Sequence, residues 1–156
     1  MAKPDATPSL DVSLAIKAPG NLVLRAFFQA EALSAWWQVI HSVTTPRVLG
    51  AYAVEWPATD YRDEILGRLG GVFRGTVIQF EPGRGFFVAD AFWLPPDGDP
   101  IGPMALEVTC TPGEGGVDVR VRQTGFEEGA RWRRYYEIVT VGWERALRSM
   151  KMLLEK

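Results

Sequence analysis

Three carboxylates lie in segments with the character of strands and could act as acids or bases. Asp90 falls within the aromatic run 86–93, while Glu55 and Glu107 lie in neighbouring segments. A carboxylate pointing into an apolar cavity has a raised pKa, which suits general acid–base catalysis such as cyclisation or dehydration of an aromatic precursor. Apolar residues on both sides of Glu107 favour the solvent face for its side chain, whereas the aromatic neighbours of Asp90 leave its direction open.

Residues that support other kinds of catalysis are scarce. His41 is the only histidine and Cys110 the only cysteine, so a metal site lacks its usual set of ligands. We expect His41 on the surface or in a loop, and Cys110 as a small buried residue of a strand. The sequence has no phosphate-binding loop and no nucleophile motif. It therefore assigns no catalytic residue, no metal ligand and no cofactor, and an enzyme is the less favoured class.

Large apolar side chains favour a binding site instead. The chain has six Trp and eight Phe residues, whose surfaces must be buried against one another or against a guest molecule. A polar residue on the buried face of a strand, Gln123, either lines such a cavity or is hydrogen-bonded in the core. Ordinary core packing is the alternative for every candidate. The predicted ligand-binding residues are Trp36, Tyr52, Trp56, Phe73, Phe92, Met104, Val108, Gln123, Trp132, Tyr136 and Trp143.

Alternating patterns predict the strands that would hold these side chains. Clusters of Gly, Pro and Asp separate the strand-like segments, which is typical of an antiparallel meander with short turns. The strands are expected over residues 10–17, 47–56, 72–80, 86–93, 104–111 and 117–124.

Apolar stretches predict three helices. Residues 22–28 and 31–37 should form two short helices, the first with Asn21 as its N-cap. From about residue 129 to the end, apolar side chains recur at spacings of three and four, which predicts one long helix. The fold class is therefore α+β: a six-stranded antiparallel sheet wraps around the long C-terminal helix, and two short helices follow the first strand.

Length and charge limit the expected domain organisation, partners and cellular location. Residues 1–9 are predicted to be a flexible tail, and residues 10–156 one domain. No apolar run approaches the roughly 20 residues that span a bilayer. The net charge of −2 and scattered basic residues exclude nucleic acid as an expected partner. A single cysteine and the lack of a signal-peptide pattern predict a cytoplasmic protein.

Five short motifs follow one another in a characteristic order. They are Ala35-Trp36-Trp37, Leu49-Gly50-Ala51-Tyr52, the run 75–82, Thr124-Gly125-Phe126 and Gly142-Trp143. In this order and spacing the chain resembles the START-like superfamily, also called SRPBCC or Bet v-like, from Leu10 onward. Within it, the chain is most similar to the group named for heat-shock-protein-90 ATPase activator homologues. The resemblance implies the helix-grip fold and a cavity that commonly takes hydrophobic ligands.

Two glycines of these motifs have expected structural roles. Gly75 should allow a sharp bend or a close backbone approach in its strand. Gly142 should let the long helix press against the sheet, so that Trp143 can lie alongside.

Binding of a small hydrophobic or aromatic molecule in a closed internal cavity is the favoured function. One alternative is a protein-interaction domain resembling co-chaperone domains, which predicts an exposed apolar patch. The other is an enzyme resembling polyketide cyclases and aromatases, which predicts a buried carboxylate or histidine beside the ligand. The sequence does not fix the oligomeric state, and it is compatible with a homodimer.

Overall fold

The described part of the chain, residues 8–156 of a computed structural model, contains a seven-stranded antiparallel sheet. The strand order in this sheet is β1-β9-β8-β7-β6-β3-β2. Its strands are β1 (Leu10–Ile16), β2 (His41–Thr44), β3 (Ala51–Trp56), β6 (Gly71–Glu81), β7 (Gly85–Leu94), β8 (Ile101–Gly113) and β9 (Gly116–Thr124). A separate hairpin pairs β4 (Arg62–Asp63) with β5 (Gly67–Arg68). Most of the predicted tail, residues 1–7, lies outside the described residues.

The meander predicted from the alternating segments is confirmed. Consecutive strands from β6 to β9 pair with one another, and β1 then pairs with β9 in the register Leu10↔Gln123 and Ile16↔Val117. Along β9 the side chains alternate as expected, because Val119 and Val121 are buried while Arg120 is exposed. The first and last strands of the chain therefore lie side by side.

Three helices within residues 8–156 complete the α+β fold, at nearly the predicted positions. They are α1 (Gly20–Ala26), α2 (Ala30–Trp37) and α3 (Ala130–Leu154). The predicted N-cap Asn21 is wrong, because Pro19 holds that position in an extended conformation and Asn21 lies inside α1. Proline suits the start of a helix, since it has no N–H that needs a partner.

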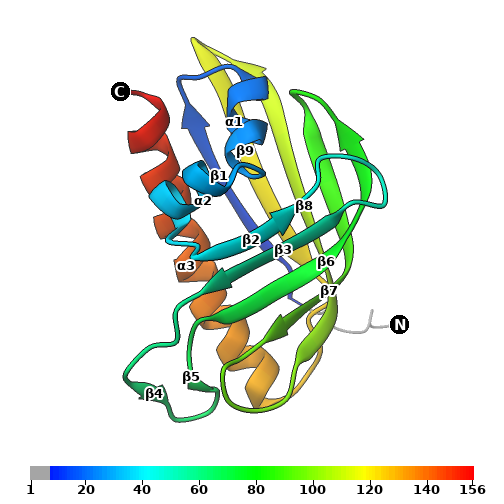
Figure 1. Cartoon of the computed structure of the whole chain (residues 1–156), viewed down its shortest axis with the longest axis vertical. Helices are drawn as coiled ribbons and strands as arrows, with labels where there is room; N and C mark the ends of the chain where they lie inside the picture. The colour runs from blue at the N-terminus through cyan, green and yellow to red at the C-terminus, as the bar shows by residue number, and fades with distance from the viewer. Residues whose placement is uncertain (1–7) are drawn as a thin grey trace, which may run out of the picture.

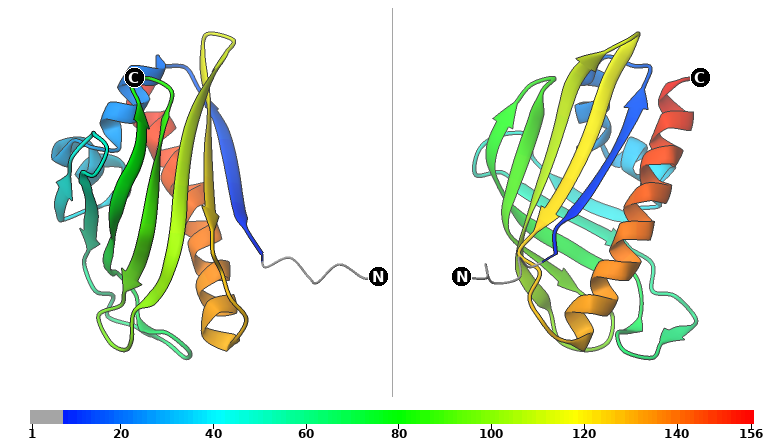
Figure 2. Two further views of the ribbon diagram at one scale, coloured as in Figure 1. Left: turned by 90° about the vertical axis from the view of Figure 1, so that its right-hand side faces the viewer. Right: turned by 180° about the vertical axis from the view of Figure 1, so that it is seen from behind.

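The sheet curves around one side of α3 (Figure 1). Figure 2 shows the same arrangement from two other directions, with α1 and α2 near the C-terminal end of α3 and the β4–β5 hairpin toward its other end. The helix-grip prediction is therefore confirmed. Within residues 8–156, no helix combines the length and the apolar character that crossing a membrane requires.

Two features of the sheet differ from the prediction. The sheet has seven strands and not six, because β2 adds to the edge beyond β3 in the register His41↔Glu55. The segment before β3 was predicted as strand from residue 47, but β3 begins at Ala51. A turn occupies these residues, in which Leu49 has a φ of 68° and donates its N–H to the carbonyl of Val77 at 2.6 Å.

The two glycines behave differently. Gly75 lies at an irregularity in the β6–β7 pairing, and a Cβ atom there would stand 2.6 Å from Cγ1 of Val88. The expected close approach is therefore confirmed. The role predicted for Gly142 is wrong, because Gly142 is exposed and a Cβ atom there would meet no atom within 4 Å. This glycine faces open space and does not press against the sheet.

Candidate functional site

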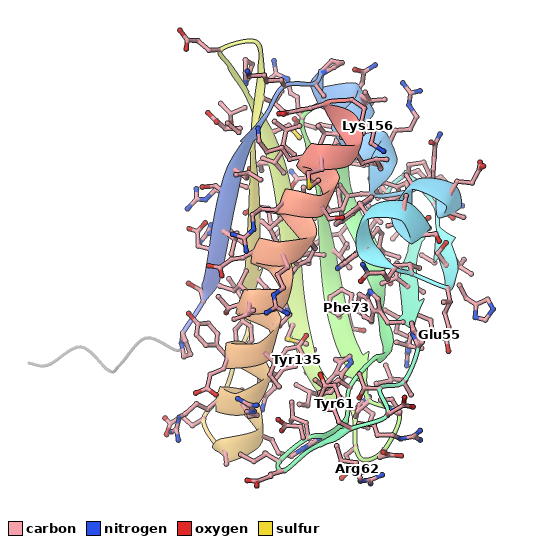
Figure 3. All side chains as sticks on the ribbon, turned by 90° about the vertical axis from the view of Figure 1, so that its left-hand side faces the viewer. Glu55, Tyr61, Arg62, Phe73, Tyr135 and Lys156 are labelled. Carbon is pink, nitrogen blue, oxygen red and sulfur yellow. The ribbon has the colours of Figure 1, made fainter. Side chains whose placement is uncertain are left out.

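A pocket with a volume of about 660 Å³ lies between α3 and the inner face of the sheet. Its walls come from the end of α2, the end of β3 and the segment after it, single residues of β6, β7 and β9, and one face of α3. Figure 3 labels Tyr135 of α3, Phe73 of β6 and Tyr61 of the segment between β3 and β4, all of which line it. Small-molecule sites commonly have volumes in this range.

Tryptophan side chains form much of the pocket wall. Five of the six Trp residues line it, and the sixth, Trp132, does not. The ring of Trp37 stacks on Trp36 with centroids 4.9 Å apart, and it lies 4.7 Å from Trp143 and 5.1 Å from Trp56. These rings come from α2, β3 and α3, so that packing between the elements produces an aromatic surface beside an open volume.

One buried polar residue, Gln123 of β9, lies at the base of the pocket. Its side chain is 1% exposed, and its amide oxygen accepts the indole N–H of Trp143 at 3.0 Å. The amide nitrogen donates to the hydroxyl of Tyr135 at 3.0 Å and to Sδ of Met104 at 3.3 Å. Because an indole N–H can only donate, the bond from Trp143 fixes the orientation of the amide group. The nitrogen must then face Tyr135.

The hydroxyl group of Tyr135 consequently keeps a free proton. Its oxygen accepts from Gln123, and within residues 8–156 no protein acceptor takes its O–H. The ring stacks on Trp93 with centroids 5.2 Å apart, which holds it in place. Burial raises the pKa of Tyr135 well above its ordinary value, and the hydrogen bond from Gln123 opposes this only in part. The hydroxyl therefore stays protonated and can donate to a group in the pocket.

The pocket opens to solvent, so the expected closed cavity is wrong. Exposed residues on its margin include Gln38, Tyr61, Arg145 and Gly142. Gln38 ends α2 in a left-handed conformation with a φ of 57°, which turns the chain away from the pocket toward β2. Gly142 leaves the rim bare where any other residue would project a side chain. The mouth therefore lies beside the middle of α3.

The β4–β5 hairpin and the residues around it form another wall. Leu66, which is 3% exposed, lines the pocket from this segment. Asp63 accepts hydrogen bonds from the backbone N–H of Leu66 at 3.0 Å and from Arg134 of α3 at 2.7 Å. The Arg134 guanidinium holds the pKa of Asp63 below its ordinary value, although burial opposes this. The ion pair thus fastens this wall to the helix.

The structure brings some of the predicted ligand-binding residues together and separates others. Those that line the pocket are Trp36, Trp56, Phe73, Gln123 and Trp143. Those that lie away from it are Tyr52, Phe92, Met104, Val108, Trp132 and Tyr136. Tyr52 is representative of the second group: it is buried in the core, where its hydroxyl donates to the carbonyl of Phe27 at 3.0 Å.

Four lining aromatic residues were missed by the sequence analysis, namely Trp37, Tyr61, Trp93 and Tyr135. A signal for Tyr135 was available, since positions 135, 139, 143, 146 and 150 follow one another at helical spacings of three and four. The neighbouring Tyr136 satisfies almost the same spacing. In the structure it is only half-buried and packs edge-on against Phe126, with centroids 5.2 Å apart.

The acid–base candidates lie outside the pocket. Asp90 is exposed at an irregularity of β7 with a φ of 55°, and Glu55 pairs with the 76% exposed His41 at 3.0 Å. Glu107 lies near Arg122, 3.6 Å away on β9. Cys110 is buried, and burial raises the pKa of its thiol to about 11. The cyclase-like hypothesis therefore loses the groups on which it depended.

Comparison with known proteins gives the same fold. A protein from Mesorhizobium loti, MLL2253, is 23% identical, with a TM-score of 0.72 over 95% of this chain and 97% of that one. Protein Ms6760 from Mycobacterium smegmatis is 17% identical, with a TM-score of 0.74 over 98% and 95%. The Aha1 dimer from Colwellia psychrerythraea is 18% identical, with a TM-score of 0.63 over 95% and 96%. No curated protein matches the chain.

The family described as activator of Hsp90 ATPase homolog 1-like proteins matches residues 17–155, from the end of β1 to the end of α3. This match covers the pocket and every element that surrounds it. It agrees with the resemblance carried by the five sequence motifs. The chain therefore belongs to the activator of Hsp90 ATPase homolog 1-like family, within the START-like superfamily.

Proposed function

We propose that this protein binds a small apolar or aromatic molecule in the pocket between α3 and the sheet. The observation that carries the proposal is an open volume of about 660 Å³ walled by five tryptophans. Burying flat aromatic surface against such rings is favourable, and offset or edge-on contacts add to the stabilisation. A pocket of this size left unfilled would forfeit those contacts along its whole lining.

The glycine at the mouth supports the proposal independently. Gly142 lies in the interior of the 25-residue helix α3, where glycine costs about 0.5–1 kcal/mol relative to alanine. No neighbouring atom requires its small size, since a Cβ atom there would meet nothing within 4 Å. Passage of a ligand over this position is a use for the missing side chain that does not depend on helix packing.

A neutral aromatic probe tests this function. We expect 6-methoxy-2-naphthamide to bind the wild-type protein in isothermal titration calorimetry, and to bind Gly142→Ala with similar affinity. Gly142→Phe should fold normally, because the position is open, yet bind the probe much more weakly because the new ring fills the mouth. Circular dichroism checks the fold of both variants. Absence of binding to the wild type, or equal binding to all three proteins, contradicts the proposal.

A protein-interaction role is a second candidate, favoured by an exposed apolar patch. The strand β2 is the last of the sheet, and it and its flanking residues expose Ile40, Val43, Val48 and Leu49 by 50%, 62%, 50% and 73%. Exposed edge strands and apolar patches are typical of association sites. A similar structure, from Colwellia psychrerythraea, is described as a dimer. We therefore propose, as the alternative, that this apolar patch at β2 mediates formation of a homodimer.

Sedimentation equilibrium tests this alternative. If β2 mediates association, Val43→Lys should yield a monomer at concentrations where the wild type is dimeric, because it places a charge in the apolar patch. Ile78→Lys, a change at an exposed residue of β6, is a control for added charge. A monomeric wild-type protein at every concentration removes the homodimer proposal.

A further inference from the structure

One polar group at the base of the pocket is a hydrogen-bond donor, the hydroxyl of Tyr135. Trp143 donates to the amide oxygen of Gln123, and the amide nitrogen of Gln123 donates to Tyr135. Both ends of this amide are therefore hydrogen-bonded within the protein. The proton of the Tyr135 hydroxyl remains, on a side chain that is 5% exposed and lines the pocket. A buried donor without an acceptor is unfavourable, and a ligand oxygen in contact with this hydroxyl would supply the acceptor.

The only charge that lines the pocket among the described residues is positive. Among the described residues that line it, Arg145 alone is charged at neutral pH, and none is an Asp or Glu. Within residues 8–156, Arg145 has no carboxylate within 4.0 Å, unlike Arg134 on the same helix, which pairs with Asp63. Arg145 is exposed at the rim, so its guanidinium remains hydrated and costs little desolvation. The mouth therefore favours an anionic group on the ligand.

The two groups are well separated along the lining face of α3, which runs from Tyr135 to Ser149. Tyr135 and Arg145 are ten residues apart in one continuous helix, which corresponds to about 15 Å along its axis. The apolar side chains between them include Ile138, Val139 and Trp143. A ligand that reaches both must be elongated, with an acceptor at its buried end, an apolar body and an anion at its outer end.

We propose that the natural ligand is an elongated aromatic or otherwise apolar monoanion, such as a carboxylate, that accepts a hydrogen bond from Tyr135 and pairs with Arg145. This inference rests on the proposed binding function and narrows it to a chemical class. The buried end excludes a second charge, because no opposite charge lines the described pocket there to offset its desolvation. Cationic ligands are disfavoured by Arg145 and by the absence of a lining carboxylate in residues 8–156.

Three related probes separate the contribution of the anionic group to binding from that of the hydrogen-bond acceptor. 6-Methoxy-2-naphthoate carries both an acceptor and an anion, its amide has the same shape without the charge, and 2-naphthoate lacks the methoxy acceptor. In calorimetric titrations of the wild type, we expect the first to bind about tenfold more tightly than its amide, as a charge-assisted contact allows. It should also bind more tightly than 2-naphthoate. Added salt should reduce the advantage over the amide, because the mouth is exposed to solvent.

Variants assign these differences to residues. Arg145→Gln should remove the preference for the acid over the amide while leaving amide binding unchanged. Arg148→Gln, one turn further along α3 and outside the lining, is the matched control and should keep the preference. Tyr135→Phe should remove the preference for 6-methoxy-2-naphthoate over 2-naphthoate. If this buried variant does not fold, the comparison of the two ligands in the wild type still tests whether the acceptor contributes to binding.

The outcomes of these titrations test the anionic ligand class separately from ligand binding in the pocket. Equal affinity of the acid and its amide, with both binding in the pocket, overturns the anionic ligand and leaves the binding function standing. An acid preference that persists in Arg145→Gln also overturns the assignment. Failure of every probe to bind the wild type contradicts the binding function itself.

Discussion

The indole N–H of Trp143 on α3 donates a 3.0 Å hydrogen bond to the amide oxygen of Gln123 on β9. Together with the hydrogen bond from Gln123 to Tyr135, this contact joins the helix to the sheet at the base of the pocket. It also sets the orientation of the Gln123 amide, and thereby leaves the Tyr135 hydroxyl as a donor that faces the pocket. The stability of the fold and the proposed ligand selectivity thus depend on the same buried network.

Replacing the amide should destabilise the protein. Gln123→Leu removes the acceptor of Trp143 and the donor to Tyr135, and a buried donor left without a partner costs about 2 kcal/mol. We expect a loss of this size in the free energy of unfolding, measured with urea. Met104→Leu removes only the weaker sulfur acceptor, 3.3 Å from the same amide, and preserves volume, so it should cost less than about 1.5 kcal/mol. Equal losses in the two variants contradict this account.

Two glycines should respond oppositely to the same substitution. Gly142→Ala places a methyl group in open space on a helix and should raise the free energy of unfolding by about 0.5–1 kcal/mol. Gly75→Ala should lower it, because the new Cβ would stand 2.6 Å from a methyl of Val88 and 2.9 Å from the carbonyl oxygen of Ala89. Thermal and urea unfolding measure both changes. A destabilised Gly142→Ala variant is incompatible with an open mouth at this position.

The ion pair between Asp63 and Arg134 predicts a pH dependence. The folded-state pKa of Asp63 lies below the unfolded value of about 3.9, so its stabilisation is present above that pH and disappears as the pH falls through the folded-state pKa. Asp63→Asn should therefore be less stable than wild type by about 1 kcal/mol at pH 7. The two proteins should become equally stable in strong acid.

Urea unfolding as a function of pH tests this prediction. Asp90→Asn is the control, since Asp90 is exposed and has no ion pair among residues 8–156. This control should not reproduce the loss of about 1 kcal/mol expected for Asp63→Asn at pH 7. A difference between Asp63→Asn and wild type that does not change with pH indicates that Arg134 stabilises the hairpin wall by some other contact.

Tryptophan fluorescence should report occupancy of the pocket. Trp37 lies within the wall, 4.7 Å from Trp143, whereas Trp132 lies outside the pocket and packs against Phe126. Adding 6-methoxy-2-naphthoate should quench the emission of wild type and of Trp132→Phe in proportion to binding. Trp37→Phe should show a smaller change at saturation. Loss of the response in Trp132→Phe would place the ligand elsewhere.

The spacing of apolar residues predicted the fold because most helices and strands are long and strongly periodic. The helix α3 spans 25 residues, and β9 alternates cleanly between Val119, Val121 and their exposed neighbours. The strand β2 escaped prediction because it has four residues, His-Ser-Val-Thr, which are too few to show a period. The same holds for the two-residue strands β4 and β5.

The pocket was only partly predictable, because its lining depends on small rotations and on distant contacts. Tyr135 and Tyr136 both fit a helical stripe, and only the position of α3 on the sheet decides which of them is buried. The hairpin wall is held by Asp63 and Arg134, which lie 71 residues apart in the sequence. A glycine such as Gly142 gives no sign in the sequence of whether it meets a tight contact or open space.

Native mass spectrometry of protein purified from its natural host tests the central claim most directly. We predict that the wild-type chain carries a small non-covalent adduct, with the mass of an apolar monoanion, which is released by collisional activation. Gly142→Phe prepared in the same way should appear at the mass of the chain alone. Identical spectra for the two proteins, without an adduct or with the same adduct in both, would contradict ligand binding in this pocket.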